Sequence, residues 1–578
     1  MIKRVSLIFL LYLGLAVILT WPLARLARDH VINAGDPLFY AWNFMHNTRA
    51  LTHGFTGLLD TNIYYPTTNT LAFSDTLAAQ TLFAAPIIWL THNPILAENL
   101  YVLLTFPVAG IGMYLLVKSL TKYELAAVFS GAMYAFSYIR FGQVSHVPAV
   151  SSQWFPYYFY GLYWFLTEGK FRHLAVALIS FLLLLGSTVY FGVFAIIVSL
   201  VMTSAFLISW MNSHTLATSR VRLKVAFLPL VFTGAISLIL MYPYIRLKAE
   251  HPEITRSLAE SSARAAYQED YTSVTNVSLL APLLKTNEGE RTLYPTVALL
   301  LLVVLGLGQW KKKRHRFPIL VFVAVALTGL ILSFGPERPF SIGQLSTGYI
   351  TLPYKYLYTL FPLLQILRVP ARFSIIFLLG VCVIAGYGIV ALVNSKTKLR
   401  RILIPALISI LFLMEIWQKP LSLVAIPTYN HAPLVYMWLR SRPDVRAIVE
   451  LPIGNIEEGT MPIQEQVMLP YENITEATPL AAETYRVYFA GLHEKKTMNG
   501  YSGYVARSFH DAVNDLSSFP NDSSIRFLQS QGVSHIIVHV WQMDKEERKQ
   551  YAPDSDLPEL TRQLTTPDGD IVYAINPR

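Results

Sequence analysis

The sequence predicts an α-helical polytopic membrane protein with about 11 transmembrane helices, followed by a small C-terminal α/β domain. Three observations predict this fold class. Apolar residues make up 53% of the 578-residue chain and charged residues only 14%, whereas soluble domains carry about 25% charged residues. Apolar runs near the roughly 20 residues needed to cross a bilayer recur through the first 418 residues. Beyond residue 418 these runs give way to short β-branched segments.

The apolar runs define the predicted spans. They are 5–26, 98–118, 124–138, 154–168, 172–188, 190–210, 225–245, 293–310, 317–334, 373–394 and 402–418. Lys and Arg cluster before the first span and after every second one, and short loops rich in these residues stay in the cytoplasm. This places the N-terminus inside and the C-terminus outside. The alternation requires that 76–91 does not cross, so we predict a re-entrant or interfacial helix there.

Every long loop then lies outside the cytoplasm. The sequence predicts a transmembrane domain at 1–418, which contains these loops, and a soluble domain at 419–578 on the same side of the membrane. These outer loops are 27–97, 139–153, 246–292 and 335–372. Residues 419–578 hold 14 basic and 20 acidic side chains, a net charge of −6, which leaves +16 on residues 1–418. Because this basic excess sits in short loops that set orientation, no nucleic acid is expected as a partner.

Residues 419–578, called the tail below, are predicted to form a small α/β domain. Residues 445–453 and 534–540 are predicted as buried strands, with a helix at 523–530 ended by Gly532. Asp568 and Gly569 predict a turn before a last strand at 571–575, hence a closing hairpin. The single cysteine, Cys382, excludes intrachain disulfides and thiolate metal sites. None of these tail elements carries a catalytic signature.

Two carboxylates in the first outer loop are candidates for chemistry. Asp36, just beyond the first span, can deprotonate an acceptor hydroxyl or bind a metal. The alternative is structural, because Asp followed by Pro is a good helix N-cap. Asp75 precedes the stretch 76–91 and has the same two interpretations. The sequence does not show whether the two carboxylates meet.

The second outer loop and the entry to the tenth span supply further polar candidates. His146 can act as a metal ligand, a phosphate contact or a general acid/base, or it can be structural. Gln143 and Gln153 can bind ligand hydroxyl groups or simply bond backbone in a tight loop. Arg368 and Arg372 can grip a lipid phosphate, or they can snorkel to ordinary headgroups. The chain has no Walker loop, dinucleotide fingerprint, GxSxG elbow or zinc spacing.

These segments together resemble the GT-C superfamily of membrane glycosyltransferases, and within it bacterial proteins near the YfhO-like group. The resemblance covers about 420 residues and only loosely reaches KKTMNGYSGY at 495–504. The matching segments are GDPLFYAWNF at 35–44, NIYYPTTNTLAFSD at 62–75, FSYIRFGQVSH at 136–146 with QW at 153–154, and RVPARF at 368–373.

The resemblance implies an inverting transfer of sugar from a polyprenyl-phosphate-linked donor to an extracytoplasmic acceptor, such as a cell-envelope glycan, lipid or protein. It implies a multi-pass protein of the bacterial cytoplasmic membrane. By position it assigns Asp36 the catalytic role, and it makes Asp75 and His146 second-tier catalytic or metal candidates. It assigns substrate binding to Gln143, Gln153, Arg368 and Arg372. The second outer loop lacks the Asp-x-Asp or Glu-x-Asp pair of many metal-dependent members, so a divalent cation such as Mg²⁺ or Mn²⁺ is an open alternative.

Two other functions remain as alternatives. A lipid or polysaccharide transporter or flippase would place ionisable residues inside its spans, and here Glu415 is the main carboxylate inside the predicted spans, near an end. A non-catalytic cell-envelope assembly protein would use the acidic tail to bind a polymer or a protein partner. Loss of activity on mutating Asp36 in a folded protein would separate the enzyme from both alternatives.

Overall fold

A computed structural model describes residues 2–212, 217–252, 254–287, 289–342, 345–397, 399–454, 479–540, 543, 548–549 and 558–576. The chain forms two compact units, each assembled from segments far apart in the sequence. Unit 1 comprises Met1–Arg25, Leu100–Tyr242 and Pro252–Ser422, and unit 2 comprises Leu26–Asn99, Pro243–His251 and Leu423–Arg578. These units differ from the predicted division at residues 418 and 419, because the first predicted outer loop belongs to the same unit as the tail.

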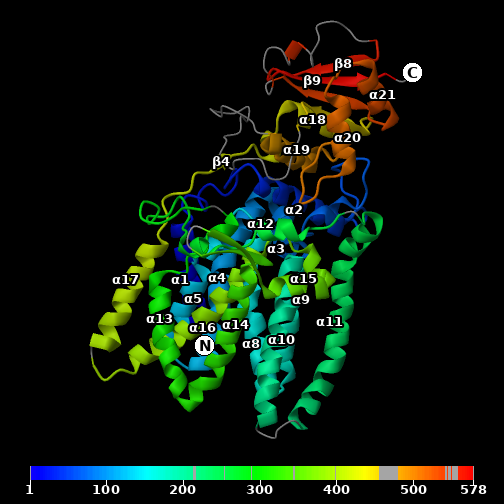
Figure 1. The fold of residues 1–578 in the computed structure, drawn as a ribbon. Helices are drawn as coiled ribbons and strands as arrows, with labels where there is room; N and C mark the ends of the chain where they lie inside the picture. Colours follow the sequence, from blue (N-terminus) through cyan, green and yellow to red (C-terminus); the bar gives the residue numbers. More distant parts are fainter. Residues whose placement is uncertain are drawn as a thin grey trace. The chain divides into compact units, whose positions relative to one another are not determined.

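Unit 1 consists mainly of long helices, drawn from blue through yellow in Figure 1. Two of them, α4 and α11, each have one end in unit 2. The long helices are α1 (Ile2–Leu19), α4 (Pro94–Thr121), α5 (Glu124–Ala135), α8 (Phe155–Glu168), α9 (Phe171–Ser187), α10 (Val189–Asn212), α11 (Ala217–Glu250), α13 (Val297–Leu307), α14 (Lys313–Ser333), α16 (Ser374–Val393) and α17 (Ile404–Ile416).

Short elements fill the predicted outer loops of unit 1. The hairpin β2–β3 is antiparallel, with Glu337 opposite Thr351. The short elements are α6 (Tyr138–Phe141), α7 (Val147–Val150), η2 (Ser152–Trp154), α12 (Leu258–Ala263), η3 (Gln268–Thr272), η4 (Gly289–Arg291), β2 (Glu337–Ile342), β3 (Leu345–Thr351), α15 (Pro353–Leu360), η6 (Pro362–Ile366) and η7 (Pro370–Phe373).

The long helices are those of a membrane protein. A helix occupies each of the predicted spans. Among the residues that the structure describes, five helical stretches are long and apolar enough to cross a bilayer, namely Pro94–Thr121, Val189–Met211, Lys224–Glu250, Lys313–Ser333 and Pro370–Val393. The number of crossings, about 11, and the sidedness of the loops stay predictions.

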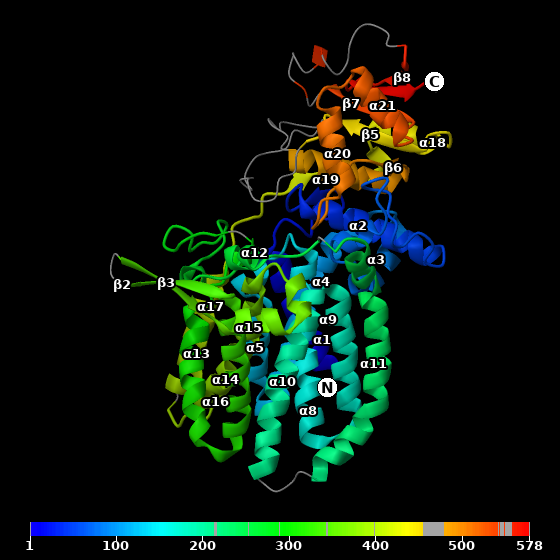
Figure 2. The same cartoon turned by 45° about the vertical axis from the view of Figure 1, so that its right-hand side comes forward.

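Glycines let α16 lie very close to α13 and α14, the green helices beside it in Figure 2. A Cβ at Gly388 of α16 would overlap the backbone of Leu302 in α13. A Cβ at Gly380 would overlap the backbone of Phe322 in α14. Lipid tails are as apolar as leucine, so helices in a bilayer associate largely through such close packing. The small residues of the tenth predicted span therefore hold this helix group together.

Glu415, the carboxylate inside the last predicted span, caps a neighbouring helix. Its side chain is 4% exposed. One carboxylate oxygen accepts from the Val297 N–H at 2.7 Å and the Tyr294 hydroxyl at 2.6 Å, and the other accepts from the Ala298 N–H at 3.0 Å. These amides open α13, where N–H groups lack partners in the helix and the helix dipole favours negative charge. A structural role thus accounts for the residue that the transporter alternative would have used.

The first part of unit 2 is the predicted first outer loop. Here β1 (His30–Val31) pairs antiparallel with β4 (Val424–Ala425). Then follow α2 (Asp36–Thr52), the 3₁₀ turn η1 (Thr70–Phe73) and α3 (Ala78–Thr91). The helix α3 has 14 residues, and its re-entrant or interfacial position stays a prediction. One face of α3 exposes Leu82, Phe83, Trp89 and Leu90, as an interfacial helix would.

The tail of unit 2 is built on a five-stranded sheet with the order β6-β5-β7-β9-β8. The strands β6, β5 and β7 run parallel, and β9 is antiparallel to both β7 and β8. The elements are α18 (Leu434–Ser441), β5 (Ala447–Leu451), α19 (Pro479–His493), β6 (Lys496–Thr497), α20 (Arg507–Leu516), α21 (Asp522–Ser530), β7 (His535–His539), β8 (Leu560–Thr565) and β9 (Asp570–Ile575). The predicted strands at 445–453, 534–540 and 571–575, the helix at 523–530 and the closing hairpin are confirmed.

Backbone hydrogen bonds join the tail sheet to the first outer loop. The Thr497 N–H of β6 donates to the Asn62 carbonyl at 2.8 Å, and the Tyr65 N–H donates to the Thr497 carbonyl at 2.9 Å. The Tyr64 N–H donates to the Asn499 carbonyl at 3.0 Å. Residues 62–65 therefore extend the free edge of the sheet, which would otherwise expose unpaired backbone groups.

Candidate functional site

Asp36 begins α2 and lies half-buried. The N-cap of this helix is Gly35, and Pro37 follows in the first turn. The structural interpretation of Asp36 as the N-cap is therefore wrong by one residue. A carboxylate in the first turn is still stabilised by the helix dipole. Asp36 is thus an anion placed at a helix N-terminus.

The Asp36 carboxylate takes hydrogen bonds from two tyrosines. The Tyr501 hydroxyl donates to Oδ1 at 2.5 Å, and the Tyr40 hydroxyl lies 3.5 Å from Oδ2. Tyr40 is one helical turn further along α2, whereas Tyr501 comes from the tail, 465 residues away. The Tyr501 ring also packs edge-to-face on Phe39, with ring centroids 5.7 Å apart. The sequence analysis quoted Tyr501 only inside a loosely matching segment and assigned it no role.

A second carboxylate, Glu98 in the first turns of α4, lies near Asp36. Glu98 is 2% exposed, and its charge interacts with that of Asp36. Its Oε2 is buried and has no hydrogen-bond partner among the described residues. Two close carboxylates either share a proton or bind a cation between them. The sequence analysis missed Glu98 because it stands at the edge of a predicted span, where a carboxylate is easily taken for a helix end.

Asp75 is placed by a contact with the side of α2 rather than with its first turn. Its backbone carbonyl accepts from the Asn43 side chain at 3.5 Å. Asn43 is seven residues after Asp36 on α2, a distance of about 10 Å along the helix. The cap of α3 is Leu77, not Asp75. Asp75 therefore lies by the middle of α2, and its second-tier role stays a prediction.

The second outer loop of unit 1 is held by a buried arginine. Arg140, 1% exposed, donates to the Thr105 hydroxyl at 3.1 Å and to Ser152. Gln153 donates to the Tyr101 hydroxyl at 3.0 Å. The Oε1 atoms of Gln153 and Gln143 are buried with no hydrogen-bond partner in the described part of the chain. Both glutamines thus have a buried acceptor to which a hydroxyl group could donate.

The two arginines before α16 are each paired with a glutamate of the 246–292 loop. Arg372 donates from Nε to Glu290 at 2.9 Å and stacks on the Tyr190 ring, 4.7 Å from its centroid. Arg368 lies 3.4 Å from Glu260. The segment is not one α-helix, because η7 begins only at Pro370, so the arginines face different partners.

His146 joins the Glu290–Arg372 pair. Burial alone would raise the pKa of Glu290, but the charge of Arg372 and that of a protonated His146 lower it below the ordinary value. The His146 Nδ1 also lies 3.3 Å from the Ser145 hydroxyl. Within unit 1 the structure therefore brings together His146 and Arg372, which the sequence could not connect, through a glutamate that the sequence analysis did not single out.

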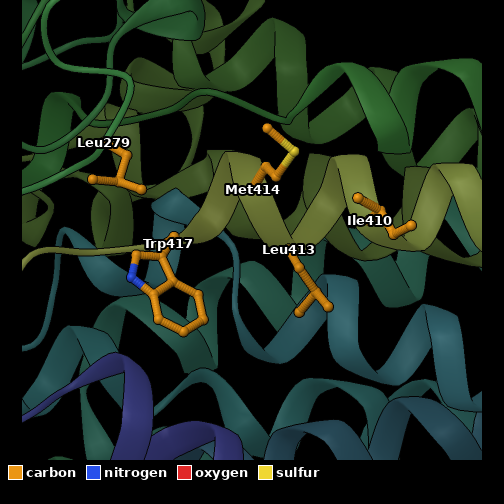
Figure 3. A pocket seen from close by; sticks show the side chains of 5 residues that line it. All are labelled: Leu279, Ile410, Leu413, Met414 and Trp417. Atoms are coloured by element: carbon orange, nitrogen blue, oxygen red, sulfur yellow. The ribbon is translucent and has the colours of Figure 1, made fainter.

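No set of three or more His, Cys, Asp or Glu side chains in the described ranges is arranged to hold a metal ion. Asp36 and Glu98 are the two carboxylates that best suit a divalent cation, which prefers oxygen ligands. A hollow of about 260 Å³ lies on α17 and is lined by Leu279, Ile410, Leu413, Met414 and Trp417 (Figure 3). None of these side chains transfers protons, so this hollow is not the reaction site.

The tail contains a buried charged cluster that sequence analysis missed. His539, at the end of β7, lies 2.8 Å from Asp570 through Nδ1 and 2.8 Å from Glu450 through Nε2. The Tyr436 hydroxyl donates to Glu450 at 2.8 Å. Burial opposes the charge on His539, but the two carboxylates outweigh it and raise its pKa to about 9. The imidazolium therefore bridges two carboxylates at neutral pH.

No protein-family model matches the chain, and no curated protein matches it by sequence. Among solved structures the chain is similar to the arabinofuranosyltransferase AftD from Mycobacteria, with a TM-score of 0.55 and 13% identity. That match covers 100% of this chain but 40% of AftD, so the chain spans about two fifths of its length.

The chain also matches the apo form of the oligosaccharyltransferase from Archaeoglobus fulgidus. The TM-score is 0.44 at 11% identity, over 99% of this chain and 74% of that one, which is too low to establish a common fold. The likeness to YfhO-like proteins stays an expectation. The comparison with AftD shows the fold alone: this chain has a fold similar to that of the arabinofuranosyltransferase AftD.

Proposed function

We propose that this protein is an inverting glycosyltransferase that moves a sugar from a polyprenyl-phosphate-linked donor to an acceptor outside the cytoplasm. The observation that carries the proposal is the Asp36 carboxylate at the start of α2, hydrogen-bonded by Tyr501 and close to a second carboxylate, Glu98. A fold shared with an arabinofuranosyltransferase supports it.

In the proposed reaction Asp36 is the general base. The acceptor oxygen forms a bond to the anomeric carbon of the sugar, while the bond between that carbon and the phosphate oxygen breaks. The bonding electron pair leaves with the polyprenyl phosphate, and the acceptor proton passes to the Asp36 carboxylate. Attack from the face opposite the leaving group inverts the anomeric centre.

The remaining predicted residues receive substrate-binding roles. A guanidinium offsets negative charge on a leaving phosphate, a role we assign to Arg372 and Arg368. Their pairing with Glu290 and Glu260 means that a phosphate would have to replace or join a carboxylate. We assign Gln143, Gln153 and His146 to the polar groups of the donor or acceptor. Asp36 and Glu98 would hold a divalent cation such as Mg²⁺ or Mn²⁺ if one takes part.

The structure offers no observation that favours the transporter or the assembly-protein alternative. Glu415 is occupied as the cap of α13, which leaves the transporter alternative without its main intramembrane carboxylate. The five-stranded tail sheet is hydrogen-bonded to the loop that holds Asp36, a placement expected if the tail serves the same site.

A donor panel tests the proposal. Purified protein in nanodiscs would receive labelled polyprenyl-phosphate sugars together with an envelope extract as acceptor, with and without Mg²⁺ or Mn²⁺. We expect labelled product from at least one donor, with its anomeric configuration opposite to that of the donor by NMR. Product with retained configuration would contradict the direct displacement, and movement of intact donor across the bilayer without transfer would favour a flippase.

A further inference from the structure

The tail of unit 2 places a tyrosine hydroxyl directly on the candidate catalytic carboxylate. Tyr501 Oη lies 2.5 Å from Asp36 Oδ1, and the ring packs edge-to-face on Phe39 of α2. A phenol that donates to a carboxylate forms a charge-assisted hydrogen bond, which is stronger than one between neutral groups. This contact is therefore more than incidental packing.

The backbone around Tyr501 is fixed from two sides. On the tail side, Asn499 accepts from the Glu450 N–H at 2.7 Å, and the Met498 N–H donates to the Ile448 carbonyl at 3.0 Å. On the loop side, the Tyr64 N–H donates to the Asn499 carbonyl, and Gly500 lies so close to the Tyr64 ring that a Cβ there would overlap it. The hydroxyl of Tyr501 is thus aimed by the sheet rather than by a loose loop.

We propose that Tyr501 is a positioning residue for Asp36, so that the tail completes the candidate catalytic site. The inference rests on the proposed function, because it assigns Tyr501 a role toward the base of that reaction. By donating to Oδ1, the phenol orients the carboxylate that receives the acceptor proton in the proposed reaction. Tyr40, 3.5 Å from Oδ2, is near enough to guide the same oxygen.

Within unit 2, Tyr40 of α2 and Glu98 of α4 also lie near Asp36. Tyr501 contributes the contact that comes from the tail, 465 residues away in the sequence.

The test compares Tyr501→Phe with Tyr504→Phe, a matched change in the same Gly-Tyr-Ser-Gly-Tyr segment. The first readout is kcat and KM, measured separately for the full-length protein in nanodiscs. Loss of the phenol should lower kcat roughly tenfold with little change in KM, because the carboxylate is no longer held in its reacting orientation. Tyr504→Phe should leave both constants at their wild-type values.

The second readout needs no activity. Thermal unfolding would be measured for wild type, Tyr501→Phe, Asp36→Ala and the double variant, because a double-mutant cycle isolates the coupling of two side chains. Tyr501→Phe should lower Tm by about 2 °C in the wild-type background and leave it unchanged with Ala at position 36, where no acceptor remains.

The outcomes separate this inference from the proposed function. A wild-type kcat in the Tyr501→Phe protein would overturn the positioning role while glycosyl transfer stands. If the wild type transfers no sugar, the proposed function fails, and additive Tm losses in the cycle would also overturn the pairing of Tyr501 with Asp36. Coupling in the cycle together with a lowered kcat upholds the inference.

Discussion

Replacing His539 by Gln should strongly destabilise the tail sheet. The imidazolium lies between Glu450 and Asp570, and it is 2% exposed. Its pKa rises from the ordinary 6.5 to about 9, and each pKa unit corresponds to about 1.4 kcal/mol, so the charged cluster contributes about 3 kcal/mol at pH 6. Gln leaves two buried carboxylates without their counter-ion, for which losses of about 3–5 kcal/mol are typical.

The pH dependence of this contribution has a definite sign. Because the folded-state pKa of His539 is raised, its stabilisation is complete below about pH 6.5 and is lost as the pH rises through about 9. For Glu450, burial would raise the pKa, but His539 lowers it below the ordinary 4.5. Its stabilisation is therefore present above pH 4.5 and is lost as the pH falls. The cluster should stabilise most between about pH 4.5 and 6.5.

Hydrogen exchange read by mass spectrometry on the full-length protein measures this effect locally. Peptides covering β5, β7 and β9 should lose protection in His539→Gln at pH 6, and the difference from wild type should shrink toward pH 10. His510→Gln is the matched control, because His510 is exposed on α20. Equal loss of protection at pH 6 and pH 10 would refute the role of the imidazolium charge. A decrease in the free energy of unfolding below about 1 kcal/mol at pH 6 would refute it as well.

Three further substitutions test separate parts of the structure. Glu415→Gln should cost about 1–3 kcal/mol in thermal unfolding, because an amide NH₂ replaces an acceptor of α13 amides; an unchanged Tm would contradict the capping role. Gly500→Ala should lower the free energy of unfolding by a similar amount, because the added Cβ would overlap the Tyr64 ring. Wild-type stability would show that the Tyr64 ring moves aside without cost. Arg372→Gln should lower kcat/KM for a polyprenyl-phosphate donor at least tenfold, because charge on the leaving phosphate is no longer offset, and an unchanged kcat/KM would remove Arg372 from the donor site.

Much of the fold could be predicted because its signal is local. Each apolar run became a helix, and the β-branched segments at 534–540 and 571–575 became β7 and β9. Hydropathy and periodicity depend on neighbours within one turn or one strand, so a single sequence suffices to read them. The stretch 76–91 likewise formed a helix, α3.

The partners of the candidate site could not be predicted, because they come together only through the tertiary fold. Asp36 was found from its place in the first loop, but Tyr501 lies 465 residues away in the sequence. Glu290 pairs with Arg372 across 82 residues, and Glu450 with His539 across 89. No spacing rule connects such residues. The segment GYSGY at 500–504 did contain a clue, since two glycines flanking a tyrosine indicate close backbone contact.

The central claim is that Asp36 is the base of a glycosyl transfer. The most direct measurement is the single-turnover rate of labelled sugar transfer from an active polyprenyl-phosphate donor by wild type, Asp36→Asn and Asp29→Asn. Asp29 is an exposed carboxylate of the same loop and serves as the control. We predict that Asp36→Asn lowers the rate by about 10²–10⁴-fold with wild-type folding, whereas Asp29→Asn leaves it unchanged. Equal rates for all three proteins would contradict the assignment of Asp36.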